Sequence, residues 1–133
     1  MKELVIEADI EKLDQVLAFV DAELEAFECS MKAQMQLDIA VEEIYVNIAH
    51  YAYGEGQGMA TIQMETEPGQ TTITFIDSGT PYNPLEKEDP DISLPAEERP
   101  IGGLGIFMVK KSMDAVEYEY IDGTNNLTMR KKI

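Results

Sequence analysis

Two short turn sequences constrain the fold of this chain more than any other feature. They are "EPGQ" (67–70) and "DGT" (122–124). Pro-Gly and Asp-Gly steps form tight turns, and alternation of polar and apolar residues is the period of a half-buried strand. The sequence therefore predicts two β-hairpins and an antiparallel sheet. Each turn lies between two alternating stretches: 59–66 and 71–77, and 115–121 and 125–133.

The rest of the chain is mainly helical in its pattern. Asp9 and Ser30 precede the first two helical patterns, and both are residue types that cap helix N-termini. The order of elements predicts an α+β fold, in which helices pack on one face of a mostly antiparallel sheet. The remaining predicted elements are a first strand and three helices: 2–8, 10–27, 31–53 and 103–113.

Length, charge and cysteine content exclude several classes of protein. The chain has 133 residues, which suits a single domain, and a formal net charge of −16. Nucleic acids and anionic membranes attract basic surfaces, so neither is an expected partner. Cys29 is the single cysteine, which argues against an internal disulfide and a cysteine-cluster zinc site. The acidic N-terminus is untypical of a signal peptide, and we expect a cytoplasmic protein.

The long helix, 31–53, has a core face on a helical wheel. All residues of this arc are apolar: Leu37, Ala40, Val41, Ile44 and Ile48. A second set falls opposite or beside the arc and is expected to face solvent: Asp38, Glu42, Tyr45 and Ala49. A further apolar pair, Ile39 and Val46, indicates a second strip of buried surface.

Glu43 and Asn47 lie between the core arc and that apolar pair, one helical turn apart. Two interpretations remain open from the residues alone. The side chains extend from the edge of the core and bond to each other. Alternatively they form a site, in which the amide oxygen of Asn47 binds Mg²⁺ and the carboxylate of Glu43 is a general base. His50 is better explained as a half-buried histidine with a hydrogen-bond partner.

Asp77 ends a hydrophobic strand at the point where "TFID" gives way to "SGTPYNP". Gly79 allows close approach of the backbone, and Pro81 and Pro84 stiffen the segment that follows. A carboxylate at this position can accept a hydrogen bond from a ligand amine, or it can form an ordinary Asx turn. Both interpretations remain open.

Three glycines crowd the start of the last helix: Gly102, Gly103 and Gly105. Helix N-termini present unpaired N–H groups that glycines allow a phosphate to approach, although a tight turn also explains the glycines. There is no Gly-Lys dipeptide and hence no P-loop, and "GLGIFM" fails the dinucleotide fingerprint. The preceding stretch, 78–101, fits neither period, and a loop of this length is usually functional or disordered.

Three segments together resemble a known family. They are "EEIYVNIAHYAYGE", "DSGTPYNP" and "GGLGIFMVKKSMD", which are similar to the N box and the two G boxes of the GHKL ATPase superfamily. The chain most resembles the small anti-sigma-factor serine kinases of the RsbW and SpoIIAB type. The resemblance implies the Bergerat fold, a two-layer α+β sandwich, and a mobile ATP lid at about 78–101.

The resemblance also implies roles for individual residues. Glu43 matches the general base, and Asn47 matches the amide that holds Mg²⁺ against the triphosphate. Asp77 matches the aspartate that binds the adenine amino group, and Gly79 the glycine beside it. The resemblance implies three further nucleotide-binding positions. The lid hinge is formed by Gly102, Gly103, Leu104 and Gly105. Arg99 is a cation near the γ-phosphate, and Thr128 supports adenine binding from the last strand.

The function that the resemblance implies is that of an ATP-dependent protein-serine kinase and anti-sigma factor. Its cofactors would be ATP and Mg²⁺, its substrate a STAS-domain anti-anti-sigma protein, and a second partner a sigma factor; it would be a homodimer. One alternative is a nucleotide-dependent binding module without kinase activity. A histidine-kinase fragment is less consistent with the sequence, because the only histidine, His50, lies inside the nucleotide box. A purely structural domain would leave the glycine cluster unexplained.

Overall fold

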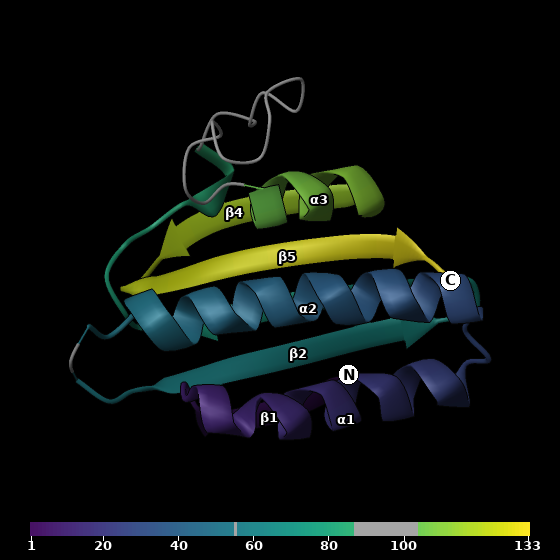
Figure 1. Cartoon of the computed structure of the whole chain (residues 1–133), viewed down its shortest axis with the longest axis horizontal. Coiled ribbons are helices and arrows are strands. Elements are labelled where there is room, and N and C mark those ends of the chain that lie inside the picture. The colour runs from purple at the N-terminus through teal and green to yellow at the C-terminus, as the bar shows by residue number, and fades with distance from the viewer. Residues whose placement is uncertain (55, 87–103) are drawn as a thin grey trace.

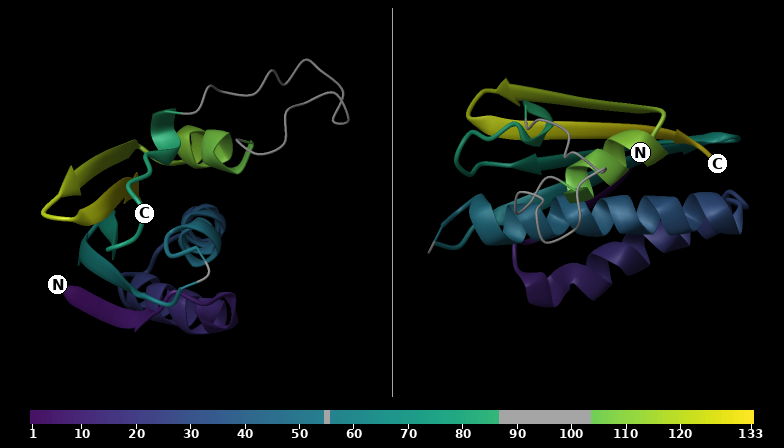
Figure 2. Two further views of the ribbon diagram at one scale, coloured as in Figure 1. Left: turned by 90° about the vertical axis from the view of Figure 1, so that its left-hand side faces the viewer. Right: turned by 45° about the horizontal axis from the view of Figure 1, so that its top comes forward.

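The computed structural model describes residues 1–54, 56–86 and 104–133, with only the backbone of Leu104. Within these ranges, five strands form one antiparallel sheet, and three α-helices lie on one of its faces (Figures 1 and 2). The predicted two-layer α+β architecture is therefore confirmed. The strands are β1 (Lys2–Glu7), β2 (Met59–Glu67), β3 (Gln70–Asp77), β4 (Ala115–Ile121) and β5 (Thr124–Lys132), and the helices are α1 (Leu13–Ala26), α2 (Met31–Tyr51) and α3 (Leu104–Ser112).

Both predicted hairpins are present, and the last strand of the chain lies inside the sheet. The strand order is β1-β2-β3-β5-β4. Asp122 and Gly123 form the turn between β4 and β5 with φ angles of +51° and +81°, as a two-residue hairpin loop requires. Because β5 pairs with β3 as well as with β4, Asp77 at the end of β3 lies directly opposite Asn125 near the start of β5.

The predicted cap of the second helix is confirmed, whereas α1 begins at Leu13, three residues later than the Asp9 cap predicts. Ser30 accepts a hydrogen bond from the backbone N–H of Ala33 at 3.2 Å, which caps α2. Asp9 accepts one from the N–H of Glu11 at 2.9 Å and starts a short 3-10 turn that leads into α1. In the described part of the chain, no helix combines the length and the hydropathy that a membrane span needs.

The core lies between α2 and the sheet. The predicted core face of α2 is confirmed, since all five residues of that arc are buried. They pack in one apolar cluster with side chains of α1, α3 and the inner face of the sheet. The largest sheet residues of this cluster are Ile62, Met64, Ile73, Phe75 and Met129.

The expectation that Tyr45 faces solvent is wrong, because its side chain is fully buried. Its hydroxyl lies 2.8 Å from the backbone oxygens of both Glu7 and Asp9 and accepts the N–H of Asp9 at 3.2 Å. Burial raises the pKa of this phenol, which keeps it protonated as a donor. Since α2 packs against α1 and α3 as well as the sheet, its buried arc is wider than the apolar residues alone indicate.

Two other residues of α2 also differ from expectation. Asp38 was assigned to the solvent face by the helical wheel, but it is half-buried beside Asp21 of α1. Ile39 was expected to border a second strip of buried surface, but its side chain is 60% exposed. The outer surface of α2 is therefore more apolar, and the α1–α2 interface more acidic, than the wheel predicts.

Candidate functional site

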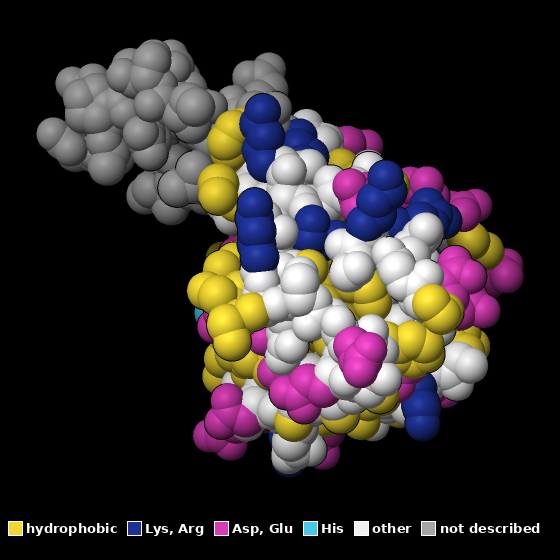
Figure 3. All heavy atoms as spheres, turned by 90° about the vertical axis from the view of Figure 1, so that its right-hand side faces the viewer, with side chains coloured by type: hydrophobic (Ala, Val, Ile, Leu, Met, Phe, Trp, Pro, Cys, Tyr) yellow, Lys and Arg dark blue, Asp and Glu magenta, His cyan; other side chains and the backbone are white. Residues whose placement is uncertain are grey.

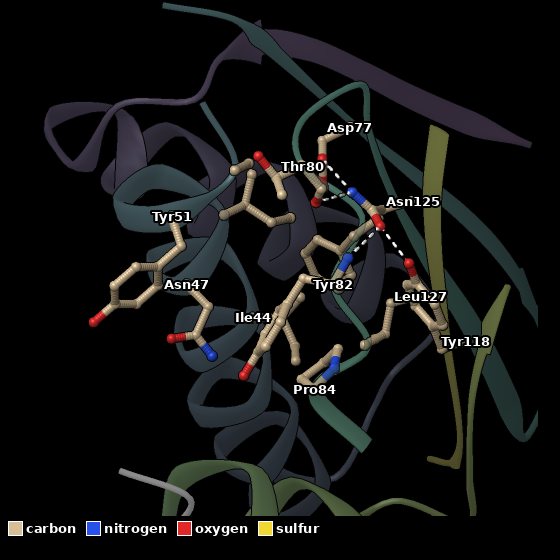
Figure 4. A pocket seen from close by; sticks show the side chains of 13 residues that line it. Ile44, Asn47, Tyr51, Asp77, Thr80, Tyr82, Pro84, Tyr118, Asn125 and Leu127 are labelled. Atoms are coloured by element: carbon tan, nitrogen blue, oxygen red, sulfur yellow. Dashed lines mark hydrogen bonds between the residues drawn. The ribbon is translucent and has the colours of Figure 1, made fainter. Parts of the chain in front are cut away.

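A pocket lies between the C-terminal half of α2 and the place where β3 ends and β5 begins (Figure 4). It holds about 500 Å³ of space, including the part that is open to solvent. Most of its lining is apolar or aromatic, and the polar residues among the lining are Asn47, Asp77, Thr80 and Asn125.

The amide of Asn125 is the centre of a hydrogen-bond network at the closed end of the pocket. Its Nδ2 donates to Oδ1 of Asp77 at 2.9 Å and to the backbone oxygen of Thr80 at 3.0 Å. Its Oδ1 accepts the backbone N–H of Tyr82 at 3.1 Å and the hydroxyl of Tyr118. Burial raises the pKa of the Tyr118 phenol, which favours its role as donor. All four positions of the amide are used, so its orientation is fixed.

Asp77 is held so that one of its oxygens remains for a ligand. The side chain is buried, and Oδ1 accepts hydrogen bonds from Asn125 and from the backbone N–H of Gly79, each at 2.9 Å. Donors among the described residues reach only Oδ1, which leaves Oδ2 as an acceptor. An apolar pocket that ends in a carboxylate acceptor suits a flat heterocycle with an exocyclic amino group.

Gly79 lies directly against the end of α2. A Cβ atom on this residue would lie 2.2 Å from the backbone oxygen of Ala52, a distance that no side chain tolerates. The same oxygen accepts the N–H of Thr80 at 2.8 Å, and the hydroxyl of Tyr53 accepts the N–H of Ser78 at 2.9 Å. Glycine is thus required for the segment after β3 to dock on α2 and turn Asp77 toward the pocket.

Glu43 and Asn47 lie at the side of the pocket that faces α3. Nδ2 of Asn47 donates to Oε1 of Glu43 at 3.3 Å, and both side chains are half-buried. A Cβ atom on Gly105 would lie 2.2 Å from Cδ of Glu43, so the first turn of α3 lies against the carboxylate. The positive end of the α3 dipole is therefore close to Glu43 and to the open side of the pocket.

Two side chains beside the pocket, Asn47 and Glu43, are candidate oxygen ligands for a metal ion. Across 1–54, 56–86 and 104–133, no group of three or more His, Cys, Asp or Glu side chains is arranged to hold a metal. Mg²⁺ commonly takes only one or two ligands from the protein and the others from phosphates and water. Asn47 and Glu43 supply oxygens of that kind beside the pocket.

The structure brings together several residues that the sequence singled out. Asn47 and Asp77 line one pocket, Gly79 positions the segment next to Asp77, and Glu43 bonds to Asn47 and contacts Gly105. Three predicted residues lie outside the described residues: Arg99, Gly102 and Gly103. Leu104 begins α3, but its side chain also lies outside the described part.

Thr128 is not brought to the pocket. Its Oγ1 lies 3.2 Å from Oγ1 of Thr74, its partner on β3. On β5 it is Asn125 and Leu127 that line the pocket, and successive residues of a strand point to opposite faces. Sequence reasoning missed Asn125, although a signal was present. Leu127 and Met129 mark the buried face of the strand, and residue 125 has the same parity.

Comparisons with known proteins point to one family. The model of the histidine kinase-like ATPase domain matches residues 6–131. Serine/threonine-protein kinase BtrW of Bordetella bronchiseptica is 24% identical over 101 residues, which are 75% of this chain and 71% of that protein. Serine-protein kinase RsbW of Listeria monocytogenes is 30% identical over 101 residues, 72% of this chain and 64% of the relative. The chain spans about three fifths of the length of the RsbW relatives that it matches, 57% to 64%.

A solved structure shares the fold. The RsbU and RsbW domains of Rv1364c from Mycobacterium tuberculosis superpose with a TM-score of 0.63 over 98% of this chain and 32% of that one. Sequence identity in this superposition is 14%, so the likeness supports the arrangement of helices and strands.

Proposed function

The chain belongs to the histidine kinase-like ATPase domain family, and on that premise we propose that it is an ATP-dependent protein-serine kinase that acts as an anti-sigma factor. One observation carries the proposal. A buried carboxylate, Asp77, closes an apolar pocket whose other side carries the pair Glu43 and Asn47. The proposal treats residues 1–133 as one domain with a lid at about 78–101, and it places the protein in the cytoplasm, where ATP is available.

In this proposal, different residues of the pocket bind the adenine, the metal ion and the phosphates of the nucleotide. Oδ2 of Asp77 would accept the amino group of adenine, whose ring would lie among the apolar side chains of α2, β3 and β5. Oδ1 of Asn47 would be the ligand of Mg²⁺. Arg99 and the Gly102–Gly105 hinge would meet the phosphates, as the family resemblance implies. Thr128 has no contact with the ligand in this arrangement, because Asn125 occupies the inward position on β5.

Glu43 is the general base in this proposal. When bound, Mg·ATP would supply the phosphoryl group and neutralise part of its charge. Glu43 would accept the proton of a serine hydroxyl, and Asn47 and Gly105 hold its carboxylate in place from two sides. With a net charge of −16, the chain should bind the anionic nucleotide only weakly without the metal, so we expect a steep dependence on Mg²⁺.

The protein substrate in this proposal is a small STAS-domain anti-anti-sigma protein, and a sigma factor is a second partner. The proposed assembly is a homodimer. The relatives named as serine-protein kinases support the reaction type. The alternative is a switch that binds partners according to its nucleotide without phosphoryl transfer. The location of Glu43 beside Asn47 favours the kinase, because binding of nucleotide alone does not need a base.

Phosphoryl transfer from γ-labelled ATP to the STAS-domain protein encoded nearest to this chain tests the proposal. We expect phosphoserine in the presence of Mg²⁺. Glu43→Gln should retain nucleotide binding, measured as thermal protection by Mg·ADP, and should lose transfer by about 100-fold or more. Glu42→Gln is the matched control, since Glu42 is the exposed neighbour on the same helix, and it should retain both properties.

Three results would contradict parts of the proposal. Unchanged transfer by Glu43→Gln would exclude Glu43 as the base. Nucleotide-dependent binding of the STAS protein without transfer would favour the switch. Absence of any thermal protection or heat of binding with Mg·ATP and Mg·ADP would refute the nucleotide pocket itself.

A further inference from the structure

A row of side chains on α2 runs from the start of the helix to the proposed base. Residues spaced by four form a ridge along a helix surface. The first three residues of this row are Met31, Met35 and Ile39, which are 82%, 61% and 60% exposed. The next two are Glu43 and Asn47. The exposed residues Met31, Met35 and Ile39, which we call the apolar ridge, therefore lead directly to the proposed site.

A further exposed methionine lies on α3. Gly105 at the start of α3 contacts Glu43, and Lys111 near its end shares a cavity with Lys32 at the start of α2. The two helices thus run in opposite directions along each other, as Figure 1 also shows. Met108 lies between these two contact points in the sequence of α3 and is 51% exposed.

A polar cavity lies where α2 begins and α3 ends. Four lysines line it: Lys32, Lys111, Lys131 and Lys132. We call this group the lysine cavity. One acid, Asp114, is also in the lining, and its Oδ2 accepts the backbone N–H of Lys132 at 2.7 Å. Lys131 donates to the backbone oxygen of Ser112 at 2.9 Å. Figure 3 shows Lys and Arg side chains gathered on this end of the molecule, beside hydrophobic side chains.

The lysine cavity is a positively charged region on an otherwise acidic protein. Four of its ten Lys and Arg residues line a single cavity, while the whole molecule carries a net charge of −16. A local positive region on an acidic protein attracts an acidic partner and sets the orientation in which that partner binds. Exposed methionines next to it offer an apolar surface that adapts to the shape of a partner.

We propose that the apolar ridge and the lysine cavity together dock the protein that carries the phosphoacceptor serine. The proposal rests on the proposed kinase function and adds the chemistry of the docking segment, which is apolar with acidic residues at one end. Its apolar side chains cover Met31, Met35 and Ile39, and its carboxylates reach the lysine cavity. The ridge ends at Ile39, one helical turn before Glu43, so a protein docked along it has its serine close to the base. A second copy of this chain on the ridge would instead cover Glu43.

The test compares docking variants with matched controls in the transfer assay described above. Met35→Ser combined with Ile39→Ser should raise the KM for the STAS protein about tenfold or more, because central apolar contacts dominate binding. The kcat at saturation and the thermal protection by Mg·ADP should not change. Val5→Ser is the matched control, since Val5 is 55% exposed on β1, away from the ridge.

The charge component has its own variant and control. Lys32→Glu should raise the same KM and weaken its dependence on salt, because one attractive contact becomes repulsive. Lys2→Glu, at an exposed position on β1, makes the same change of charge outside the cavity and should leave KM as it is.

The possible results separate this proposal from the kinase proposal. Transfer with an unchanged KM in the ridge and lysine variants overturns the docking surface and leaves the kinase intact. Loss of self-association in the ridge variant, with an unchanged KM, overturns it in favour of a second copy. If no transfer occurs, calorimetry with the same STAS protein and Mg·ADP decides. Binding that the ridge variant weakens supports the docking surface, and no binding overturns both proposals.

Discussion

Two carboxyl groups between α1 and α2 should make the free energy of unfolding of this chain depend on pH, and this can be measured without any ligand. Oδ1 of Asp21 and Oδ1 of Asp38 are buried and find no donor among the described residues. Burial is the main cause that raises the pKa of Asp38 to about 7, followed by the neighbouring Asp21 carboxyl, which can accept a hydrogen bond from protonated Asp38, and by the charges of Asp21 and Glu25. Ionised carboxylates only accept hydrogen bonds, so a proton retained on Asp38 supplies the donor that the pair lacks.

The sign of the effect follows from the two states of the chain. The ordinary pKa of 3.8 applies to Asp38 in the unfolded chain, and the folded value is about 7. The favourable contribution is therefore complete below about pH 4 and is lost as the pH rises to about 7. The difference between the two values corresponds to at most about 4 kcal/mol. Because Asp38 keeps partial contact with water, screening reduces this to about 1–2 kcal/mol.

Asp38→Asn should remove the loss of stability that accompanies ionisation of Asp38, because an asparagine amide is neutral and can donate to Asp21. We expect the variant to exceed the wild type in free energy of unfolding by about 1–2 kcal/mol at pH 8.5. Its advantage should shrink steadily toward pH 4.5. Urea denaturation at both pH values measures this difference. Glu42→Gln, which removes an exposed carboxylate from the same helix, should show no such trend. An equal advantage at both pH values, or none at pH 8.5, would refute the shared proton.

Two further predictions concern the pocket. Gly105→Ala should leave the melting temperature close to that of the wild type, since residue 105 is in the first turn of α3 and the added methyl group meets the flexible end of Glu43. It should lower phosphoryl transfer at least about tenfold, because the added Cβ would lie 2.2 Å from Cδ of Glu43 and displace the carboxylate; full transfer activity would count against Glu43. Asp77→Ala and Asn125→Ala should each weaken Mg·ADP binding about tenfold or more in calorimetry, whereas Thr128→Ala should not. If only Thr128→Ala lost affinity for Mg·ADP, Thr128 and not Asn125 would be the binding residue on β5.

Local signals were sufficient to predict the elements of the fold, but the complete strand order needed long-range contacts. The Ser30 cap and the Pro-Gly and Asp-Gly turns act through neighbouring residues, so the sequence reveals them directly. The pairing of β3 with β5 brings Asp77 to Asn125, 48 residues away, and no local pattern encodes it. Tyr45 was misplaced for a related reason. Its hydroxyl is buried because Glu7 and Asp9 supply partners from another part of the chain.

At the site, sequence reasoning could not decide which face of β5 a given residue occupies. Neighbouring residues on β5 face opposite sides of the sheet, so the choice between Thr128 and an inward residue decides whether a side chain reaches the pocket. The family resemblance pointed to Thr128, whereas the alternation of Leu127 and Met129 points to Asn125. Parity along the strand follows from burial in this chain and therefore indicates which side chains line the pocket, whereas a role of Thr128 in nucleotide binding stays a prediction.

The distribution of cations supports separate tasks for the two ends of α2. No Lys or Arg in the described part of the chain lines the proposed nucleotide pocket at the C-terminal end of α2, yet four lysines line the cavity at its N-terminal end. If lysines had gathered in response to the nucleotide phosphates, the described ones would lie near Asn47. Their location at the other end of the helix is consistent with the proposed acidic partner on the apolar ridge, and the proposed nucleotide would then rely on Mg²⁺, the α3 N-terminus and, as the family resemblance implies, Arg99.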